Sequence, residues 1–209
     1  ISGRHEQLEQ ILIDPVMRNQ KMTGYMFGII ASVSYGLNPL FALPLYAAGI
    51  KVDSVLFYRY VFALFFLGLM MKAGKQSFAL KRGEILPLAV MGLLFSFSSL
   101  FLFQAFNYMD AGIASTILFM YPVLVAVIMA VFFKERLSMV KMVSIATAFV
   151  GISMLYNGEG GATLSMAGVC FVLLSSLTYA LYIVGVNRSF LKDMPGMKLT
   201  FYALAFGSL

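Results

Sequence analysis

Long apolar stretches separated by short polar segments dominate this chain. Each stretch is close to the roughly 20 residues that an α-helix needs to cross about 30 Å of hydrocarbon. Six complete stretches lie at 24–48, 54–71, 85–107, 111–133, 139–156 and 166–187. A seventh begins near Met197 and runs to Leu209. Helices satisfy their own backbone hydrogen bonds in lipid, so the pattern predicts an all-α polytopic membrane protein.

One stretch occurs twice. Residues 24–37 read GYMFGIIASVSYGL, and residues 168–181 read GVCFVLLSSLTYAL, 144 positions later. Five helices separate the two starts, and because five is odd the second copy enters the membrane from the opposite side. Inverted repeats of this kind are typical of secondary transporters. The offset therefore predicts an inverted repeat of five-helix halves, with ten helices in full and about six and a half here.

The repeat divides the chain into three segments. Residues 1–21 are polar, and we expect them to be either sequence upstream of the native start or a cytoplasmic helix. Residues 22–157 are expected to form the first repeat, with helices 1 to 5. Residues 164–209 are expected to begin the second repeat, with helix 6 and part of helix 7.

Composition and charge narrow the class of protein. The chain is 61% hydrophobic and 11% charged, with a mean hydropathy of +0.89, whereas average soluble domains carry about 25% charged residues. The net charge of +6 could indicate a nucleic-acid partner. However, a cytoplasmic N-terminus places all but two of the 15 Lys and Arg residues, Lys51 and Arg59, on the cytoplasmic side. This bias follows the positive-inside rule, so we predict no nucleic-acid partner and a multi-pass protein of the bacterial inner membrane or plasma membrane.

The residues needed for catalysis do not come together in the predicted spans. The single histidine, His5, lies in the polar N-terminal segment, so the spans cannot build a Ser–His pair. They also contain no metal-ligand cluster and no phosphate-binding Gly–Lys motif. We therefore expect no enzyme activity, no catalytic residue, no metal and no cofactor.

Polar residues inside the spans are the first candidates for a transport pathway, because such groups usually face a bundle interior or a water-filled cavity. Asn38 precedes Pro39 in the first span, and a helix broken by proline can line a cavity. Gln104 and Asn107 lie three apart, on roughly one helical face. Packed kinks and hydrogen bonds between helices are the structural alternatives for these three residues.

Aromatic and charged residues supply the other candidates. Tyr121, Tyr179 and Tyr182 could stack on a planar or apolar substrate, or could place their hydroxyls at helix contacts. Arg59 would cost about 2.5–3.5 kcal/mol at the bilayer centre, so we expect it to snorkel or pair as a structural anchor. Asp110 is expected to cap the following helix, and Glu135 to join a cytoplasmic ion-pair network.

Residues 111–138, AGIASTILFMYPVLVAVIMAVFFKERLS, carry a more specific pattern. Small residues follow a short turn, Tyr121-Pro122 falls in mid-helix, and a Lys-Glu-Arg-Leu sequence follows the helix. Together with the Phe-Tyr-Arg-Tyr sequence at 57–60, Gln104-Ala105 and Gly151-Ile152, this order resembles the EamA domain of the drug/metabolite transporter superfamily. The resemblance covers about residues 22–209.

The resemblance implies a transporter of ten helices with a central cavity lined by helices 1, 3, 4 and their counterparts. Members of this superfamily move amino acids, nucleobases or other small metabolites, often outward. Many relatives carry Trp at the helix 1 position where this chain has Tyr35, so a relative's substrate does not transfer to this chain.

These observations predict a secondary transporter that moves a small metabolite as an exporter by alternating access. A passive facilitator and a non-transporting membrane scaffold are the alternatives. The expected partners are a small-molecule substrate and the lipid bilayer, and a coupling proton and a homodimer are further options. The predicted substrate-pathway residues are Asn38, Gln104, Asn107, Tyr121, Tyr179, Tyr35 and Tyr182.

Overall fold

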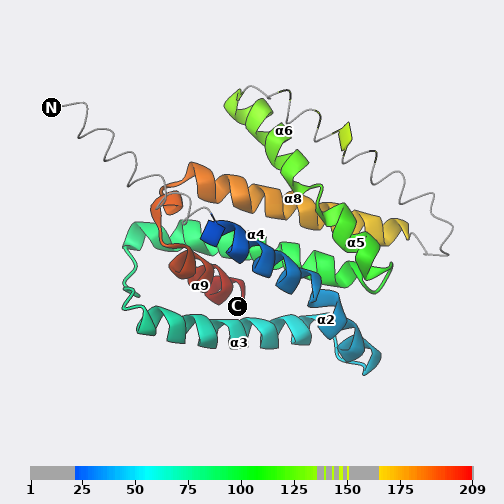
Figure 1. The fold of residues 1–209 in the computed structure, drawn as a ribbon, viewed down its shortest axis with the longest axis horizontal. Coiled ribbons are helices and arrows are strands. Elements are labelled where there is room, and N and C mark those ends of the chain that lie inside the picture. The colour runs from blue at the N-terminus through cyan, green and yellow to red at the C-terminus, as the bar shows by residue number, and fades with distance from the viewer. Residues whose placement is uncertain are drawn as a thin grey trace. The chain divides into compact units, whose positions relative to one another are not determined.

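The computed structural model describes residues 22–135 and 165–208, together with the single positions 139, 143, 146, 147 and 150 (Figure 1). The predicted segment 1–21 lies outside the described residues, and so does most of the predicted span at 139–156. The chain divides into two compact units, Ile1–Pro44 and Leu45–Leu209. The helices of each unit are described separately.

The first unit contains the first predicted span, which is broken near its middle. Residues 22–36 are helical, Leu37 forms a turn, and α2 (Asn38–Ala47) follows and continues into the second unit. Pro39 lies in the first turn of α2, a position at which a residue without an N–H is well tolerated. The break expected from Asn38-Pro39 is therefore confirmed, one residue before Asn38.

The helices of the second unit agree with the predicted spans to within a few residues. They are α3 (Val52–Ala73), α4 (Arg82–Ala105), α5 (Ala111–Leu118), α6 (Tyr121–Phe133), α8 (Met166–Arg188), the short 3₁₀ segment η1 (Phe190–Asp193) and α9 (Gly196–Gly207). Five helical stretches of the described chain, counting α5 with α6 and residues 22–36 with α2, are long and apolar enough to cross a membrane. The described chain is all-helical, as the apolar stretches predict.

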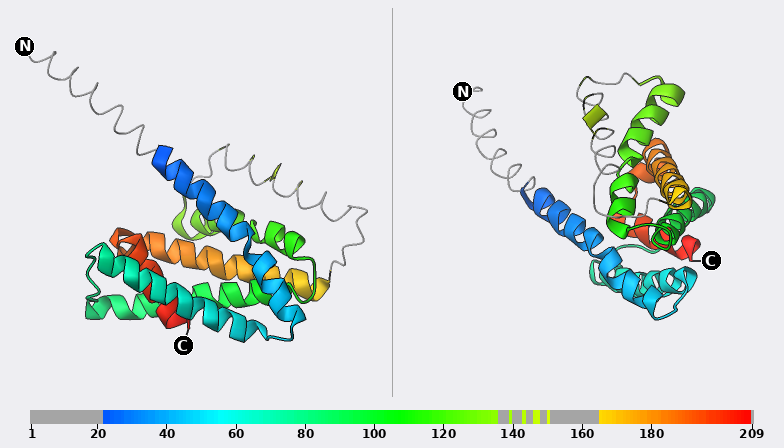
Figure 2. Two further views of the ribbon diagram at one scale, coloured as in Figure 1. Left: turned by 60° about the horizontal axis from the view of Figure 1, so that its bottom comes forward. Right: turned by 90° about the vertical axis from the view of Figure 1, so that its right-hand side faces the viewer.

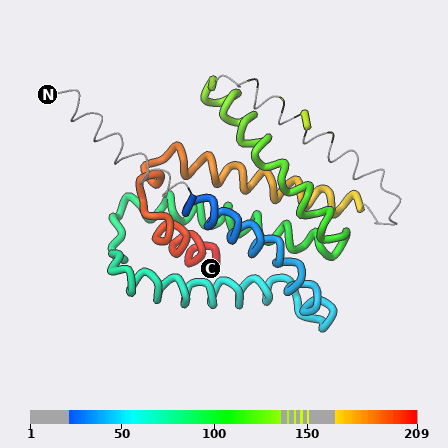
Figure 3. The backbone as a smooth tube through the Cα atoms, viewed as in Figure 1, coloured from blue at the N-terminus to red at the C-terminus, as the bar shows by residue number. Residues whose placement is uncertain are grey.

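Helix α4 lies alongside α8 in the second unit (Figures 2 and 3). Helix α9 packs against both α4 and α3, and α5 and α6 pack on α8. Small residues allow the closest of these contacts. A Cβ atom added to Gly92 of α4 would lie 2.6 Å from the carbonyl oxygen of Ala203 in α9. Close backbone approach of this kind holds helices together in lipid, because apolar side chains gain little by contacting another helix instead of lipid tails.

Buried serines join α4 to α8. The Ser98 hydroxyl donates to the Ser175 carbonyl oxygen at 3.0 Å, and the Ser175 hydroxyl donates to the Ser98 carbonyl oxygen at 2.6 Å. Hydrogen bonds between spans contribute about 0.6 kcal/mol on average in a membrane. This reciprocal pair fixes the register of the two helices on which the candidate site is built.

Charged residues occupy the helix ends. The Asp110 carboxylate accepts hydrogen bonds from the backbone N–H groups of Gly112 at 2.8 Å and Ile113 at 3.2 Å, so the predicted cap of the following helix is confirmed. Glu135 follows the end of α6 and pairs with Arg188 of α8 at 3.5 Å. Glu135 was expected to form ion pairs, and its pair with Arg188 confirms this for one partner.

Candidate functional site

The fourth span is broken between α5 and α6. Residues Phe119 and Met120 form a turn, and Pro122 follows in the first turn of α6. Because proline has no N–H, the carbonyl of Leu118 four residues earlier loses its usual helical donor. The buried hydroxyl of Ser176 in α8 donates to this carbonyl oxygen at 3.2 Å. A side chain from a neighbouring helix therefore replaces the hydrogen bond that proline removes.

A continuous series of aromatic rings lies next to this break. It runs from α3 across α4 and α8 to α6, and we call it the aromatic row; its members are Tyr60, Phe95, Tyr182, Tyr179 and Tyr121. Pairs of this kind contribute about 0.5–1.5 kcal/mol beyond the area that they bury. The row therefore links four helices of the second unit.

The contacts are closest at the α6 end of the row. The ring centroids of Tyr121 and Tyr179 are 4.8 Å apart, with the rings nearly perpendicular at 86°. Tyr179 and Tyr182 stack at 5.9 Å, one helical turn apart on α8. Phe95 lies 5.5 Å from Tyr182 and 6.4 Å from Tyr60. The other four members of the row are partly exposed, whereas the side chain of Tyr60 is buried and 7% exposed.

The tyrosine hydroxyls of α6 and α8 distinguish between the two roles that the sequence allows. Tyr121, Tyr179 and Tyr182 form no side-chain hydrogen bond within the described part of the chain. A tyrosine placed to fasten a helix contact usually finds a partner for its hydroxyl when it is buried. The arrangement therefore favours rings and hydroxyls that are available to a ligand over purely structural anchors.

The structure brings together three of the predicted pathway residues, Tyr121, Tyr179 and Tyr182. Gln104 is in the last turn of α4, outside the row. Asn107 is exposed in the turn after α4. The helix α4 ends at Ala105, and the backbone N–H of Asn107 donates to the Gln104 carbonyl oxygen at 3.1 Å in the turn that follows. The place of these two residues in a pathway stays a prediction.

The two remaining predicted residues belong to the first unit. Tyr35 lies in the last turn of the helix at 22–36, and Asn38 is the first residue of α2, directly after the break. Their place in a pathway stays a prediction.

Three residues of this region were not predicted from the sequence. Phe95 is one of 20 phenylalanines, and no spacing distinguishes it from the others. Tyr60 occurs in the Phe-Tyr-Arg-Tyr sequence but has no periodic signal of its own. Ser176 could have been found, because Pro122 implies an unpaired carbonyl at Leu118 and a hydroxyl in another span is the simplest donor.

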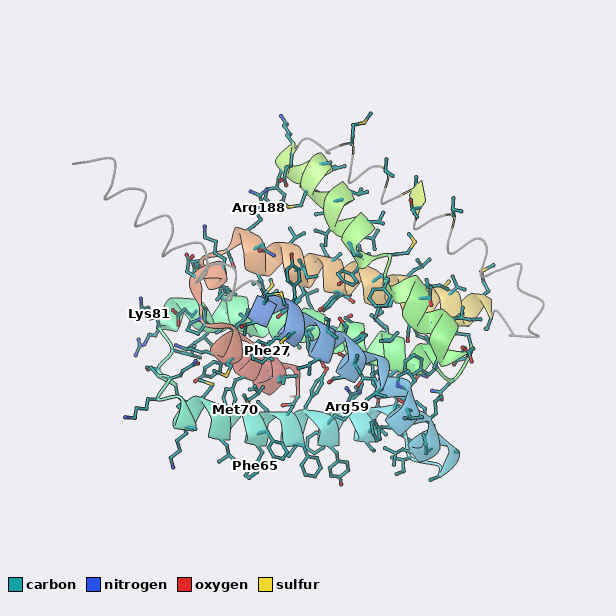
Figure 4. The ribbon with its side chains drawn as sticks, in the orientation of Figure 1. Phe27, Arg59, Phe65, Met70, Lys81 and Arg188 are labelled. Atoms are coloured by element: carbon teal, nitrogen blue, oxygen red, sulfur yellow. The ribbon has the colours of Figure 1, made fainter. Side chains whose placement is uncertain are left out.

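One cation lies close to the row. The guanidinium carbon of Arg59, which Figure 4 labels, lies 4.6 Å from the ring centroid of Phe103 in α4. Arg59 directly precedes Tyr60 in α3. Among the described residues, no group of three His, Cys, Asp or Glu side chains could hold a metal ion. The chemistry of this region is therefore aromatic and cationic.

Comparison with known proteins identifies the family. The sequence profile of the EamA-like transporter family matches residues 22–157. The chain belongs to this family. Together with the apolar helices of membrane-spanning length, membership makes it a multi-pass membrane protein. Membership in this family of the drug/metabolite transporter superfamily also indicates transport rather than catalysis.

The similar curated proteins are named as transporters. "Uncharacterized transporter YxxF" of Bacillus subtilis (strain 168) is 27% identical over 173 residues, which cover 80% of this chain and 55% of that protein. "Uncharacterized transporter YcbK" of the same organism is 25% identical over 186 residues, or 87% of this chain and 59% of the relative. An "Uncharacterized transporter" of Archaeoglobus fulgidus is 28% identical over 102 residues, which cover 49% of this chain and 36% of that protein.

The chain thus spans little more than half the length of the two Bacillus relatives. No solved structure matches it.

Proposed function

We propose that this chain is part of a secondary transporter that exports a small metabolite, such as an amino acid or a nucleobase, by alternating access. The observation that carries the proposal is the aromatic row beside the α5–α6 break. Tyr121 begins α6 directly after the break and contacts Tyr179 of α8. Broken helices at membrane depth are typical of transporter binding sites, since their free backbone groups line a cavity.

The halves of such a transporter move relative to each other around the substrate. In this proposal residues 22–157 form the first repeat and residues 164–209 begin the second. Tyr121 comes from the first repeat and Tyr179 from the second, so their contact lies between the two parts that would move. The N-terminus is cytoplasmic and the protein lies in a cell membrane, as the distribution of Lys and Arg indicates.

A passive facilitator is the second candidate, and the positions of the described acids favour it. Asp53 and Glu84 are in the first turns of α3 and α4, and the others lie outside the membrane-length helices, at positions 110, 135 and 193. A coupling proton would need a carrier deeper in the membrane, from residues outside the described ranges. A non-transporting scaffold is less well supported, because a bundle that only packs does not need tyrosine hydroxyls without hydrogen-bond partners inside its spans.

Flux through the full-length protein in proteoliposomes tests this proposal. A panel of amino acids and nucleobases is offered with and without a pH gradient. Saturable flux that accelerates with the gradient supports a proton-coupled transporter, whereas saturable flux that ignores the gradient supports the facilitator. Absence of flux for the whole panel, from folded protein, would favour the scaffold.

Variants of the row locate the site within the protein. Tyr121→Ala and Tyr179→Ala should each reduce flux. Tyr108→Ala is the matched control, because Tyr108 stacks on Phe171 of α8 at 5.5 Å but lies outside the row. Equal flux through all three variants would show that the row is not the substrate site.

A further inference from the structure

The connection between α3 and α4, residues 74–81, has its backbone tied to both helices. The N–H of Gly74 donates to the Met70 carbonyl oxygen of α3 at 2.8 Å, and the N–H of Lys81 donates to the Glu84 carboxylate of α4 at 3.0 Å. Residues 76–81 are not helical. The carbonyl groups in this part of the loop therefore have no helical donors and can accept hydrogen bonds from another element.

Helix α9 supplies those donors. The Lys198 ammonium donates to the Ala79 carbonyl oxygen, and the Tyr202 hydroxyl donates to the Phe78 carbonyl oxygen, each at 2.5 Å. Lys198 and Tyr202 lie four residues apart, so one face of α9 carries both. The ring of Phe201 meets the ring of Phe78 edge to face, with centroids 5.7 Å apart. We call these three contacts the loop latch.

Helix α9 makes a different kind of contact near its other end, where it meets α4 (Figure 1). The Ser96 hydroxyl donates to the Gly207 carbonyl oxygen at 2.7 Å. A Cβ atom added to Gly207 would lie 2.8 Å from the carbonyl oxygen of Gly92, so the two backbones are in direct contact. Gly92 and the neighbouring Ala203 are buried. One end of α9 is therefore held by close backbone packing and the other by side chains that reach a loop.

The two contacts differ in what their separation would cost. The hydrogen bonds of the latch are exposed, so water can replace them when they break. Separation of the close α4–α9 contact would leave voids in a packed interior. The loop also contains a buried oxygen, Oε1 of Gln76, that has no hydrogen-bond partner among the described residues. Movement of the loop would give this oxygen access to water, which favours opening at the latch.

We propose that the loop latch is a gate at the membrane face where α3 ends and α4 begins. Helix α9 opens this gate by pivoting about its contact with Gly92 and Ser96 of α4. The inference rests on the proposed function, in which α3 and α4 belong to the first repeat and α9 to the second. Alternating access requires contacts between the repeats that form in one state and break in the other. In the predicted orientation, the closed latch blocks the pathway on the cytoplasmic side.

Distances between two spin labels in the full-length protein test the gate in liposomes, without substrate or flux. One label is placed at Lys72→Cys in the last turn of α3, and the other at Gly196→Cys in the first turn of α9. Lys72 is exposed, and a Cβ atom at Gly196 meets no atom within 4 Å, so both labels fit. Cys170, which is exposed, and any other cysteine of the full-length protein are replaced by serine. Pulsed electron paramagnetic resonance should show mostly the shorter, closed separation.

Variants then assign the closed separation to the latch. Lys198→Met and Tyr202→Phe remove one donor each and keep most of the side chain. Together they should raise the ratio of longer to shorter separations about fivefold or more, because two hydrogen bonds of the closed state are lost. Arg188→Gln is the matched control. Arg188 also joins the two proposed repeats through an exposed polar contact, with Glu135 at 3.5 Å, but it lies outside the latch.

A shift to longer separations in the double latch variant, without a shift in Arg188→Gln, would support the gate. Separations that the double variant leaves unchanged would overturn it. An equal shift in Arg188→Gln would also overturn it, since the bundle would then be loosened as a whole. Tyr202→Phe alone removes a single oxygen atom and should shift the ratio about two- to tenfold, so it repeats the test if the double variant fails to fold. A failed flux assay would leave these distances standing, so the two proposals fail separately.

Discussion

The two copies of the repeated sequence show how the same residues acquire different roles. In the second copy, Ser176 of α8 donates its hydrogen bond across to the Leu118 carbonyl oxygen. Its counterpart Ser32 donates to the Gly28 carbonyl oxygen of its own helix at 2.9 Å. A helix pattern therefore specifies a hydroxyl at a given position, and the neighbouring helix determines the acceptor.

The glycines at the start of the two copies differ in the same way. A Cβ atom added to Gly168 would lie 3.0 Å from the sulfur of Met109. A Cβ added to Gly24 would meet no atom of its own unit within 4 Å. The close approach predicted by small residues is thus realised in α8, and in the first copy it stays a prediction.

The largest expected difference between the copies is at the two serines. Ser176→Ala leaves the buried Leu118 carbonyl without a donor and should lower the free energy of unfolding by about 1–3 kcal/mol. Ser32→Ala removes a hydrogen bond within one helix turn and should change it by about 0.5 kcal/mol or less. Denaturation in detergent measures both variants.

Pro122 provides a control for the serine prediction. Pro122→Ala restores an N–H that can bond the Leu118 carbonyl, so Ser176→Ala should cost less in that background. An unchanged cost in the double variant would show that the hydrogen bond across the break contributes nothing.

The next expected effect is on transport and concerns Tyr35 and Tyr179, which occupy equivalent positions in the repeat. Tyr179→Leu loses the ring contacts with Tyr121, Tyr182 and Phe95. It should lower flux about two- to tenfold. An inverted repeat predicts a similar loss for Tyr35→Leu, whereas normal flux through that variant would argue that the copies contribute unequally to the pathway.

The smallest expected effect is at the paired glycines. Gly168→Ala pushes a methyl group against the Met109 side chain and should cost about 1 kcal/mol of unfolding free energy. Gly24→Ala should be neutral or slightly stabilising, since alanine is the better helix former. An equal cost at both sites in the full-length protein would show that the first copy is packed as tightly as the second.

Much of the helix arrangement along the chain follows from residue chemistry. Apolar length predicts α3 at 54–71 where the structure has Val52–Ala73, and the cap at Asp110 follows from its position before a small-residue helix. The turn before Pro122 was not predicted, because the stretch at 111–133 was expected to form one span, although a proline without an N–H is a signal for such a turn. The stretch predicted at 85–107 runs two residues past the end of α4 at Ala105, because apolarity alone does not mark where a membrane helix stops.

The pairing of side chains between helices is less predictable. In a soluble helix the apolar stripe shows which face is buried. In a membrane span both the lipid-facing and the helix-facing positions are apolar, so no stripe distinguishes Phe95 from the other phenylalanines. Tyr121, Tyr179 and Tyr182 were predictable as candidates because they are amphipathic, but their contacts with one another were not.

The sequence by itself determined that this chain is an all-helical membrane protein with a repeated span, since length, apolarity and an offset of 144 residues are local properties. Only the tertiary structure decided that Ser176 meets the Leu118 carbonyl and that the ring of Tyr60 meets the ring of Phe95. Such contacts join residues far apart in the chain, and they depend on the register and rotation of helices whose apolar surfaces are nearly equivalent in lipid.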